Sequence, residues 1–182
     1  MVSTRRRADA TRRQALAGLT GMAGSLLVPA WAQQAPPGEA QAAPPPQLGS
    51  LLPLPELTLL DGTRFRPTDA DGQVMVLYWW ASWCPFCAQQ SPWMDKFWVA
   101  HKSSGLRMLG LTIDRKAEDA SAYLSKKGYT FPAGLVTPAV ARVLPKPKGL
   151  PVTIVRGRDG RVLAAETGQL FPEDIEQFAR FL

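Results

Sequence analysis

Residues 83–87 are Trp83-Cys84-Pro85-Phe86-Cys87 and contain the only two cysteines of the 182-residue chain. They follow the apolar run Val74-Met75-Val76-Leu77-Tyr78-Trp79-Trp80, which is typical of a buried β-strand. We expect Trp79 and Trp80 to alternate between the two faces of that strand, both buried. Pro85 suits the first turn of an α-helix. The two thiols therefore sit at a strand-to-helix junction, close enough to form a disulfide.

This placement favours a redox dithiol. The start of a helix offers unpaired N–H groups and the positive end of the helix dipole, and both stabilise a thiolate. We therefore expect Cys84 to be the nucleophile, with a lowered pKa. Cys87 lies one turn further along and suits the resolving role, in which it attacks the Cys84 sulfur of a mixed disulfide.

Other uses of a Cys-x-x-Cys pair are weaker. Structural zinc needs four protein ligands, and the chain offers no further cysteine and only His101. A two-thiolate copper(I) site stays open, because thiolates favour that ion. A purely structural disulfide would close too small a loop to constrain the unfolded chain much. We predict no metal site and no cofactor besides the Cys84–Cys87 disulfide.

Residues 1–32 have the pattern of a cleavable export signal. A basic stretch containing five arginines precedes an apolar stretch from Ala15 to Val28, and Ala30-Trp31-Ala32 fits a small-x-small cleavage site. The apolar stretch is shorter than the roughly 20 residues that span a bilayer, so a membrane tether is expected only if cleavage fails. Thr11-Arg12-Arg13-Gln14-Ala15-Leu16 resembles the twin-arginine consensus, although general secretion stays open. Both routes lead to the periplasm.

The formal charge of +6 belongs mostly to this signal. Removing residues 1–32 takes away five of the 21 basic and one of the 15 acidic residues, which leaves +2. Without interleaved basic and aromatic residues, nucleic-acid binding is not expected. Residues 33–50 are rich in Pro and Ala and should form a flexible linker. The remaining residues, 51–182, suit one domain, which we expect to be monomeric.

Further patterns give the order of elements. A hairpin is predicted around Asp61-Gly62, and a helix through about His101 follows the 74–80 strand. A second core strand (106–113), a helix (117–127), a short helix (139–144), a second hairpin (152–155 with 161–165) and a final helix (172–182) complete the chain. Parallel βαβ pairing followed by an antiparallel hairpin predicts a thioredoxin-like α/β fold, with helices on both faces of a mixed sheet and an extra N-terminal β-hairpin.

Over about residues 51–182 the chain resembles the TlpA/ResA/DsbE group of thioredoxin-like thiol:disulfide oxidoreductases. The resemblance rests on Pro55–Leu59 before Asp61-Gly62, on Trp80–Cys87, and on Gly149–Thr153. It implies an exported enzyme that reduces disulfides of periplasmic proteins and receives electrons from a membrane donor of the DsbD/CcdA type. A dithiol oxidant of the same fold remains open, because Pro-containing pairs such as Pro85-Phe86 occur in both types.

The resemblance also assigns site residues. It implies that Pro151 is a cis-proline facing the dithiol and that Leu150 offers backbone groups to an extended substrate strand. It implies too that Trp83 forms part of the docking surface.

Two positions depart from the pattern. Tyr78 stands where thioredoxins keep a buried Asp, and Gln90 stands where TlpA-like reductases often have a Glu. Neither side chain supplies a carboxylate base for Cys87. Our hypothesis is that Gln90 positions a water or hydrogen-bonds locally. The intervening Pro85 and Phe86 tune the dithiol without adding charge.

Overall fold

The computed structural model describes residues 42–182. The predicted export signal and residues 33–41 of the predicted linker therefore lie outside the described part of the chain. Within the described part, no helix combines the length and the apolar character needed to cross a bilayer.

The packed chain begins earlier than the predicted boundary at Leu51. The amide of Ala43 donates to the carbonyl of Lys146 (3.1 Å), and the amide of Gly49 donates to the carbonyl of Val162 (2.8 Å). These backbone hydrogen bonds tie the last part of the predicted linker to the domain. Its composition gives no sign of them, since backbone pairing depends on the neighbouring segments more than on its own side chains.

The helices and strands follow one another in the order expected of an α/β fold. The strands are β1 (Leu57–Thr58), β2 (Arg64–Phe65), β3 (Val74–Trp80), β4 (Leu106–Thr112), β5 (Ala133–Leu135), β6 (Val152–Arg156) and β7 (Val162–Thr167). The α-helices are α1 (Pro85–His101), α2 (Ala117–Lys127), α3 (Pro138–Val143) and α4 (Pro172–Glu176). Short 3-10 helices span Pro67–Ala70 and Gln177–Phe181.

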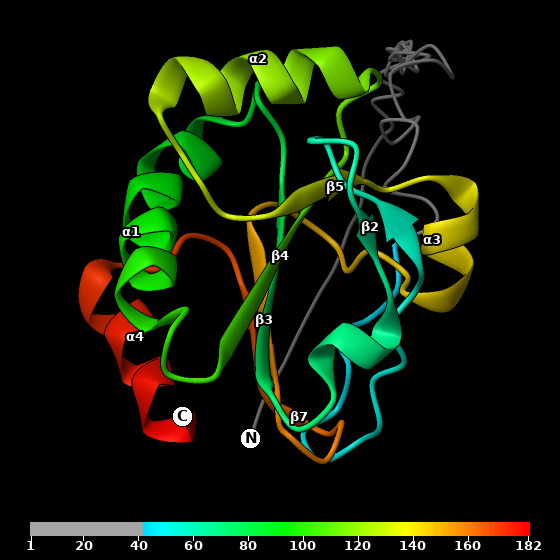
Figure 1. Ribbon diagram of the computed structural model, residues 1–182, viewed down its shortest axis with the longest axis vertical. Helices are drawn as coiled ribbons and strands as arrows, with labels where there is room; N and C mark the ends of the chain where they lie inside the picture. Colours follow the sequence, from blue (N-terminus) through cyan, green and yellow to red (C-terminus); the bar gives the residue numbers. More distant parts are fainter. Residues whose placement is uncertain (1–41) are drawn as a thin grey trace, which may run out of the picture. The chain divides into compact units, whose positions relative to one another are not determined.

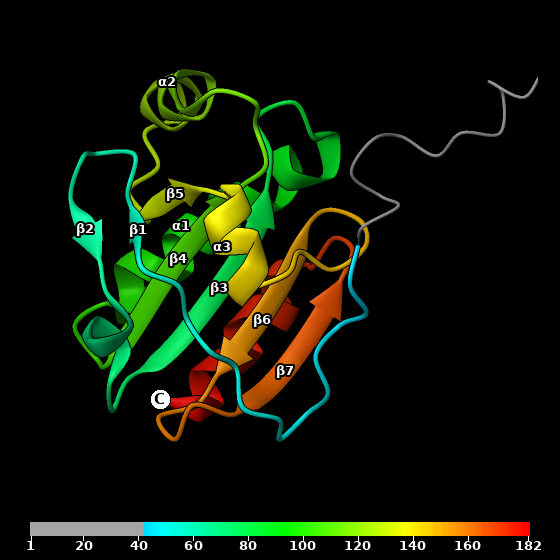
Figure 2. The same cartoon turned by 90° about the vertical axis from the view of Figure 1, so that its right-hand side faces the viewer.

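Five strands form one mixed sheet in the order β5-β4-β3-β6-β7, as Figure 2 shows. The pairs β3–β4 and β4–β5 are parallel, whereas β6 is antiparallel to both β3 and β7. β1 and β2 make a separate antiparallel pair beside the Asp61-Gly62 turn. The predicted thioredoxin-like fold with its extra N-terminal hairpin is confirmed. The short strand β5 is not among the predicted elements, because three residues carry no usable pattern.

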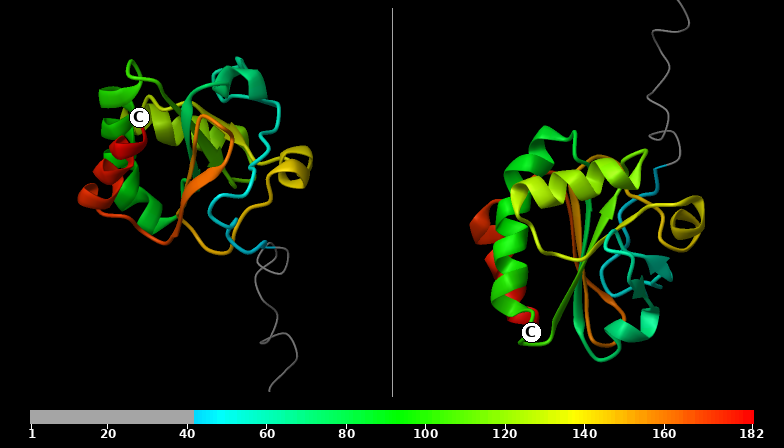
Figure 3. Two further views of the ribbon diagram at one scale, coloured as in Figure 1. Left: turned by 90° about the horizontal axis from the view of Figure 1, so that it is seen from below. Right: turned by 45° about the horizontal axis from the view of Figure 1, so that its top comes forward.

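β3 lies in the centre of the sheet, and all seven of its residues are buried. Alternate side chains enter two separate hydrophobic clusters, with Trp80 in one and Trp79 in the other, as predicted. Helices α1 and α4 cover one face of the sheet (Figure 1), and both contribute residues to the Trp80 cluster. α3 and the β1–β2 pair lie on the opposite face (Figure 3), and they contribute residues to the Trp79 cluster. Each fully buried aromatic side chain contributes about 3 kcal/mol through this burial.

α2 spans the predicted range, whereas α3 begins and ends one residue before the predicted range 139–144, and a local signal marks one end of each helix. α2 ends at Gly128, whose φ of 69° is the left-handed conformation that glycine adopts readily. α3 begins after Thr137, whose side-chain oxygen accepts a hydrogen bond from the amide of Val140 (3.2 Å). These ends set the lengths of the connections on either side of β5.

Candidate active site

Cys84 and Cys87 form a disulfide at the start of α1. Cys84 is the N-cap and Pro85 is the first helical residue, and the Cα atoms of the two cysteines are 5.2 Å apart. The Cys84 sulfur accepts a hydrogen bond from the amide of Cys87 at 3.2 Å. It therefore lies where the unpaired amides and the dipole of α1 stabilise negative charge. Cys84 is 4% exposed and Cys87 is 1% exposed.

Tyr78 lies beneath the dithiol. Its hydroxyl donates to the carbonyl of Cys87 at 3.3 Å and is 3.0 Å from the side-chain oxygen of Ser91. Ser91 donates to the same carbonyl at 2.8 Å. Burial raises the pKa of the Tyr78 phenol well above its ordinary value, so the ring stays neutral and puts no negative charge beside Cys87.

Gln90 is fully buried one turn beyond Cys87. Its Nε2 donates to Oγ1 of Thr153 on β6 (3.0 Å), and its Oε1 accepts from the amide of Leu170 (2.8 Å) in the loop between β7 and α4. The hypothesis expected a water or a local bond. The hydrogen bonds instead reach 63 and 80 residues along the chain, because α1 packs against both segments. Gln90 therefore ties together three elements that surround the dithiol.

The Leu150–Pro151 peptide bond is cis, the geometry that the resemblance implied. Val152 on β6 pairs with Trp79 on β3, so Pro151 lies beside the end of β3 that leads to Cys84. The Pro151 carbonyl accepts from the amide of Gly168 (2.9 Å). Leu150 packs against the cluster that contains both cysteines. Within residues 42–182, its amide and carbonyl make no hydrogen bond.

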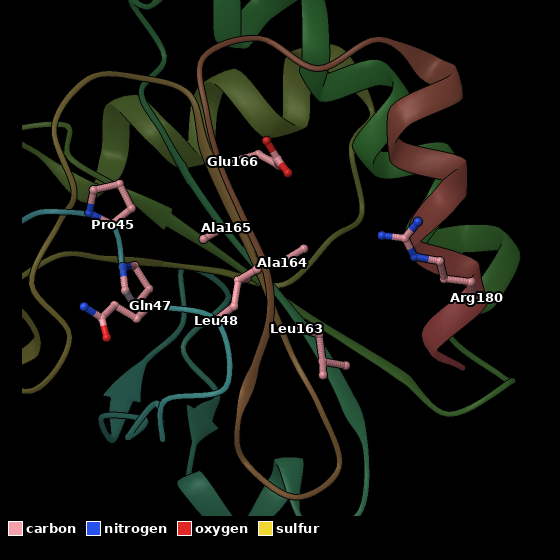
Figure 4. A pocket seen from close by; sticks show the side chains of 9 residues that line it. Pro45, Gln47, Leu48, Leu163, Ala164, Ala165, Glu166 and Arg180 are labelled. Atoms are coloured by element: carbon pink, nitrogen blue, oxygen red, sulfur yellow. The ribbon is translucent and has the colours of Figure 1, made fainter.

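The surface around the dithiol is apolar and exposed. Trp83 is 65% exposed and Phe86 is 55% exposed, and Pro85 is exposed as well. Large apolar side chains in such positions are typical of surfaces that dock another chain. A groove of about 390 Å³ lies elsewhere, along the outer edge of β7 beside Arg180, and Figure 4 shows its lining residues. Neither cysteine lines that groove.

Asp114 and Thr153 lie beside the site but carry no strong signal in the sequence. Asp114 accepts hydrogen bonds from the amide and hydroxyl of Ser82, two residues before Cys84. A position just after the second of two parallel strands is a usable signal, because the carboxyl ends of β3 and β4 meet at one edge. Thr153 had a weaker signal, as one polar residue in the apolar run of β6.

The chain also matches a known protein family. The model of the AhpC/TSA family matches residues 48–141, just over half of the chain. The chain belongs to the AhpC/TSA family. The match includes the dithiol and all elements from β1 to β5, and it ends within α3.

Individual relatives of this AhpC/TSA protein are thiol-disulfide enzymes. It is 29% identical over 133 residues to the thiol-disulfide oxidoreductase ResA of Geobacillus thermodenitrificans. The aligned residues cover 71% of this chain and 75% of that protein. Among solved structures it resembles a putative thiol:disulfide interchange protein DsbE from Chlorobium tepidum, with a TM-score of 0.62 and 29% identity over 74% of this chain and 94% of that one. A putative protein disulfide isomerase from Bacteroides thetaiotaomicron matches with a TM-score of 0.69 and 24% identity over 78% and 94%.

These findings make the AhpC/TSA chain a thiol-disulfide oxidoreductase of the ResA/DsbE type, with Cys84–Cys87 as its active-site disulfide. Among residues 42–182, no group of three or more histidine, cysteine, aspartate or glutamate side chains is placed to hold a metal ion.

We predict a pH-dependent stability for Gln90→Glu. The new carboxyl group would occupy a buried site, so its pKa should rise above the value of about 4.3 in the unfolded chain. Between these two pKa values the folded variant holds a proton that the unfolded chain has released. The free energy of unfolding, relative to the unmodified protein, should therefore fall as pH rises from about 4 to 8, by about 1.4 kcal/mol per unit of pKa shift. Urea denaturation at a series of pH values measures this.

Gln89→Glu is the matched control, because Gln89 is exposed and bonds only the side chain of Gln169 among the described residues. Its stability difference should not vary with pH over this interval. If Gln90→Glu behaves in the same way, the side chain of residue 90 reaches water and does not fasten the three elements.

Proposed function

We propose that the protein is an exported reductase that breaks disulfides in periplasmic proteins. In this reaction the reduced Cys84–Cys87 pair gives two electrons to a substrate disulfide, and the disulfide present in the structure is the oxidised form that remains. The thiol-disulfide chemistry rests on the family, while the direction of electron flow and the location are the proposal.

The lack of a positive charge in the residues next to Cys84 supports the proposed direction. The two residues between the cysteines, Pro85 and Phe86, add no positive charge, and the hydrogen bond to the Cys84 sulfur comes from a neutral backbone amide. A strong oxidant needs a reduced form that is heavily stabilised. With the helix end as the main support for the thiolate, the reduced pair should give up its electrons readily.

We assign the nucleophile to Cys84 and the resolving thiol to Cys87. The Cys84 thiolate attacks one sulfur of the substrate disulfide, the substrate S–S bond breaks, and the second substrate sulfur leaves as a thiolate that takes a proton. Cys87 then loses its proton and attacks the Cys84 sulfur, which releases the first substrate sulfur and forms the Cys84–Cys87 disulfide. The slightly greater exposure of Cys84 and its place at the N-cap support this order.

The proton of Cys87 has no carboxylate to accept it at either of the two positions that depart from the family pattern. Tyr78 is a neutral phenol, and both ends of the Gln90 amide are already hydrogen-bonded. We propose that water takes this proton. The rate of the resolving step should then depend mainly on the pKa of the Cys87 thiol itself.

We propose that the substrate docks as an extended strand beside Leu150. The unpaired amide and carbonyl of this residue suit the backbone hydrogen bonds of strand addition, and Trp83 and Phe86 offer apolar contact next to the reactive sulfur. Substrates of this kind expose a disulfide within a segment that can be drawn out into a strand.

Export is proposed from the pattern of residues 1–32, with residues 33–41 leading to the folded domain. Since reduced nicotinamide cofactors are not expected outside the cytoplasm, the proposed electron source is a membrane reductase of the DsbD/CcdA type. The proposed working form is a monomer.

The reduction potential tests the proposed direction. We expect a value closer to about −270 mV, which is typical of thioredoxin, than to about −120 mV, which is typical of a strong dithiol oxidant. Equilibration of the protein with dithiothreitol and glutathione buffers, followed by alkylation and mass spectrometry, measures it. A value at the oxidising end would reverse the proposed direction and leave the chemistry intact.

Single cysteine variants test the two roles. With a disulfide-bonded peptide as substrate, Cys87→Ala should accumulate a mixed disulfide through Cys84, because no second thiol resolves it. Cys84→Ala should accumulate none, since the remaining thiol is 1% exposed. Mass spectrometry under non-reducing conditions detects the adduct. An adduct on Cys84→Ala alone would exchange the roles.

Trp83→Ala tests the docking surface. The side chain is 65% exposed, so its removal should leave the thermal midpoint unchanged. The KM for a protein disulfide should rise about fivefold, which corresponds to about 1 kcal/mol of lost contact. Trp93→Ala is the control, because Trp93 lies more than two turns beyond Cys84 on α1. An equal rise in KM for both variants would remove Trp83 from the docking surface.

A further inference from the structure

Asp114 is the only acidic or basic residue that is buried within residues 42–182, with 6% of its surface exposed. It follows β4, whose last residue, Thr112, pairs with the last residue of β3, Trp80. The carboxylate therefore lies at the edge of the sheet from which the chain continues to Cys84. Burying an unpaired carboxylate costs several kcal/mol. The buried position of Asp114 therefore depends on the hydrogen bonds that its carboxylate accepts.

The Asp114 carboxylate accepts hydrogen bonds from the turn that precedes Cys84. Oδ2 accepts from the amide of Ser82 (3.0 Å) and from the hydroxyl of Thr112, while Oδ1 accepts from the hydroxyl of Ser82 (2.7 Å). The amide of Asp114 donates to the Thr112 side-chain oxygen (3.2 Å). Hydrogen bonds to a charged acceptor are about twice as strong as those between neutral groups. The amide and the hydroxyl of Ser82 are thus both held by one side chain.

Ser82 lies inside the turn that orients Cys84. The amide of Cys84 donates to the carbonyl of Ala81 (3.2 Å), which closes the turn across Ser82. At the far end of this turn, the Cys84 sulfur meets the amide of Cys87. Motion of Ser82 would also move the Cys84 sulfur, because few bonds separate the two residues.

We propose that Asp114 is a positioning residue for thiol-disulfide exchange, which fixes the Ala81–Cys84 turn so that the Cys84 sulfur stays at the N-terminus of α1. This role serves thiol-disulfide exchange in either direction of electron flow. The carboxylate makes no contact with substrate and transfers no proton in this role.

Asp114 can affect the pKa of Cys84 through its negative charge and through its hold on the turn. Loss of the charge and loss of the turn should shift that pKa in opposite directions, so the two effects can be told apart. A nearby negative charge disfavours a thiolate, so its removal alone should lower the pKa of Cys84. Loss of the turn should raise that pKa, because the sulfur leaves the amide and the helix end. In Asp114→Asn the amide oxygen accepts from the Ser82 amide, and the new NH₂ group donates to the Ser82 hydroxyl. This variant keeps the turn without the charge.

The experiment titrates the Cys84 thiolate of the reduced protein by its ultraviolet absorbance and by the pH dependence of alkylation. For Asp114→Ala we expect the pKa of Cys84 to rise by about one unit and the rate of disulfide exchange at pH 7 to fall up to about tenfold, in proportion to the thiolate fraction. For Asp114→Asn we expect a pKa at or below that of the unmodified protein. Ser82→Ala, which loses only the Oδ1 bond, should give a smaller rise and serves if Asp114→Ala does not fold.

Asp95→Ala is the matched control. Oδ1 of Asp95 also accepts three hydrogen bonds, from the amide and hydroxyl of Thr130 and from the amide of Phe131, yet it lies 11 residues beyond Cys84 in sequence on α1. The Asp95→Ala substitution should lower the thermal midpoint of unfolding and leave the pKa of Cys84 unchanged. An unchanged or lowered Cys84 pKa in Asp114→Ala, or an equal rise in Asp95→Ala, would overturn the proposal.

Discussion

The burial of β3 on both faces is the constraint on which the rest of the domain depends. Its seven residues fill the centre of the sheet, so the strand can neither slide nor turn over without exposing aromatic rings. Because the strand is fixed, the point at which the chain leaves the sheet is fixed too. The reactive sulfur appears four residues after Trp80, at the start of a helix that packs back on the same strand. The position of the reactive Cys84 sulfur is therefore set by the point at which β3 ends.

Much of this arrangement follows from the sequence, because its strongest signals are local. The apolar run of β3, Pro85 after the first cysteine and the Asp61-Gly62 turn each depend on neighbours in the chain, and each lies where predicted. The fold class followed from the order of these elements. The resemblance to a known family, and not the pattern of residues, led to the cis geometry at Pro151.

The parts that could not be predicted depend on contacts between distant segments. Gln90 was singled out by its departure from a family pattern, yet its partners Thr153 and Leu170 become neighbours only when the sheet forms. Asp114 has no local partner that would mark it, apart from Thr112, until β3 and β4 align. These two side chains hold the segments on either side of Cys84: Gln90 lies on α1 and bonds to β6, and Asp114 follows β4 and bonds to the turn before Cys84. Polar side chains buried in this way specify geometry more than they add stability.

The early start of the packed chain also bears on how the protein avoids aggregation. An outermost strand presents unpaired backbone groups that invite strands from other molecules. Here the backbone of Gly49 and Ser50 is bonded to Val162, and the amide of Leu52 to Gly160, so the chain occupies the first half of the β7 edge with its own residues. Beyond Leu163 the edge carries exposed Glu166, whose charge opposes the stacking of like edges. A segment whose composition resembles a mere spacer thus acts as a cover for the sheet.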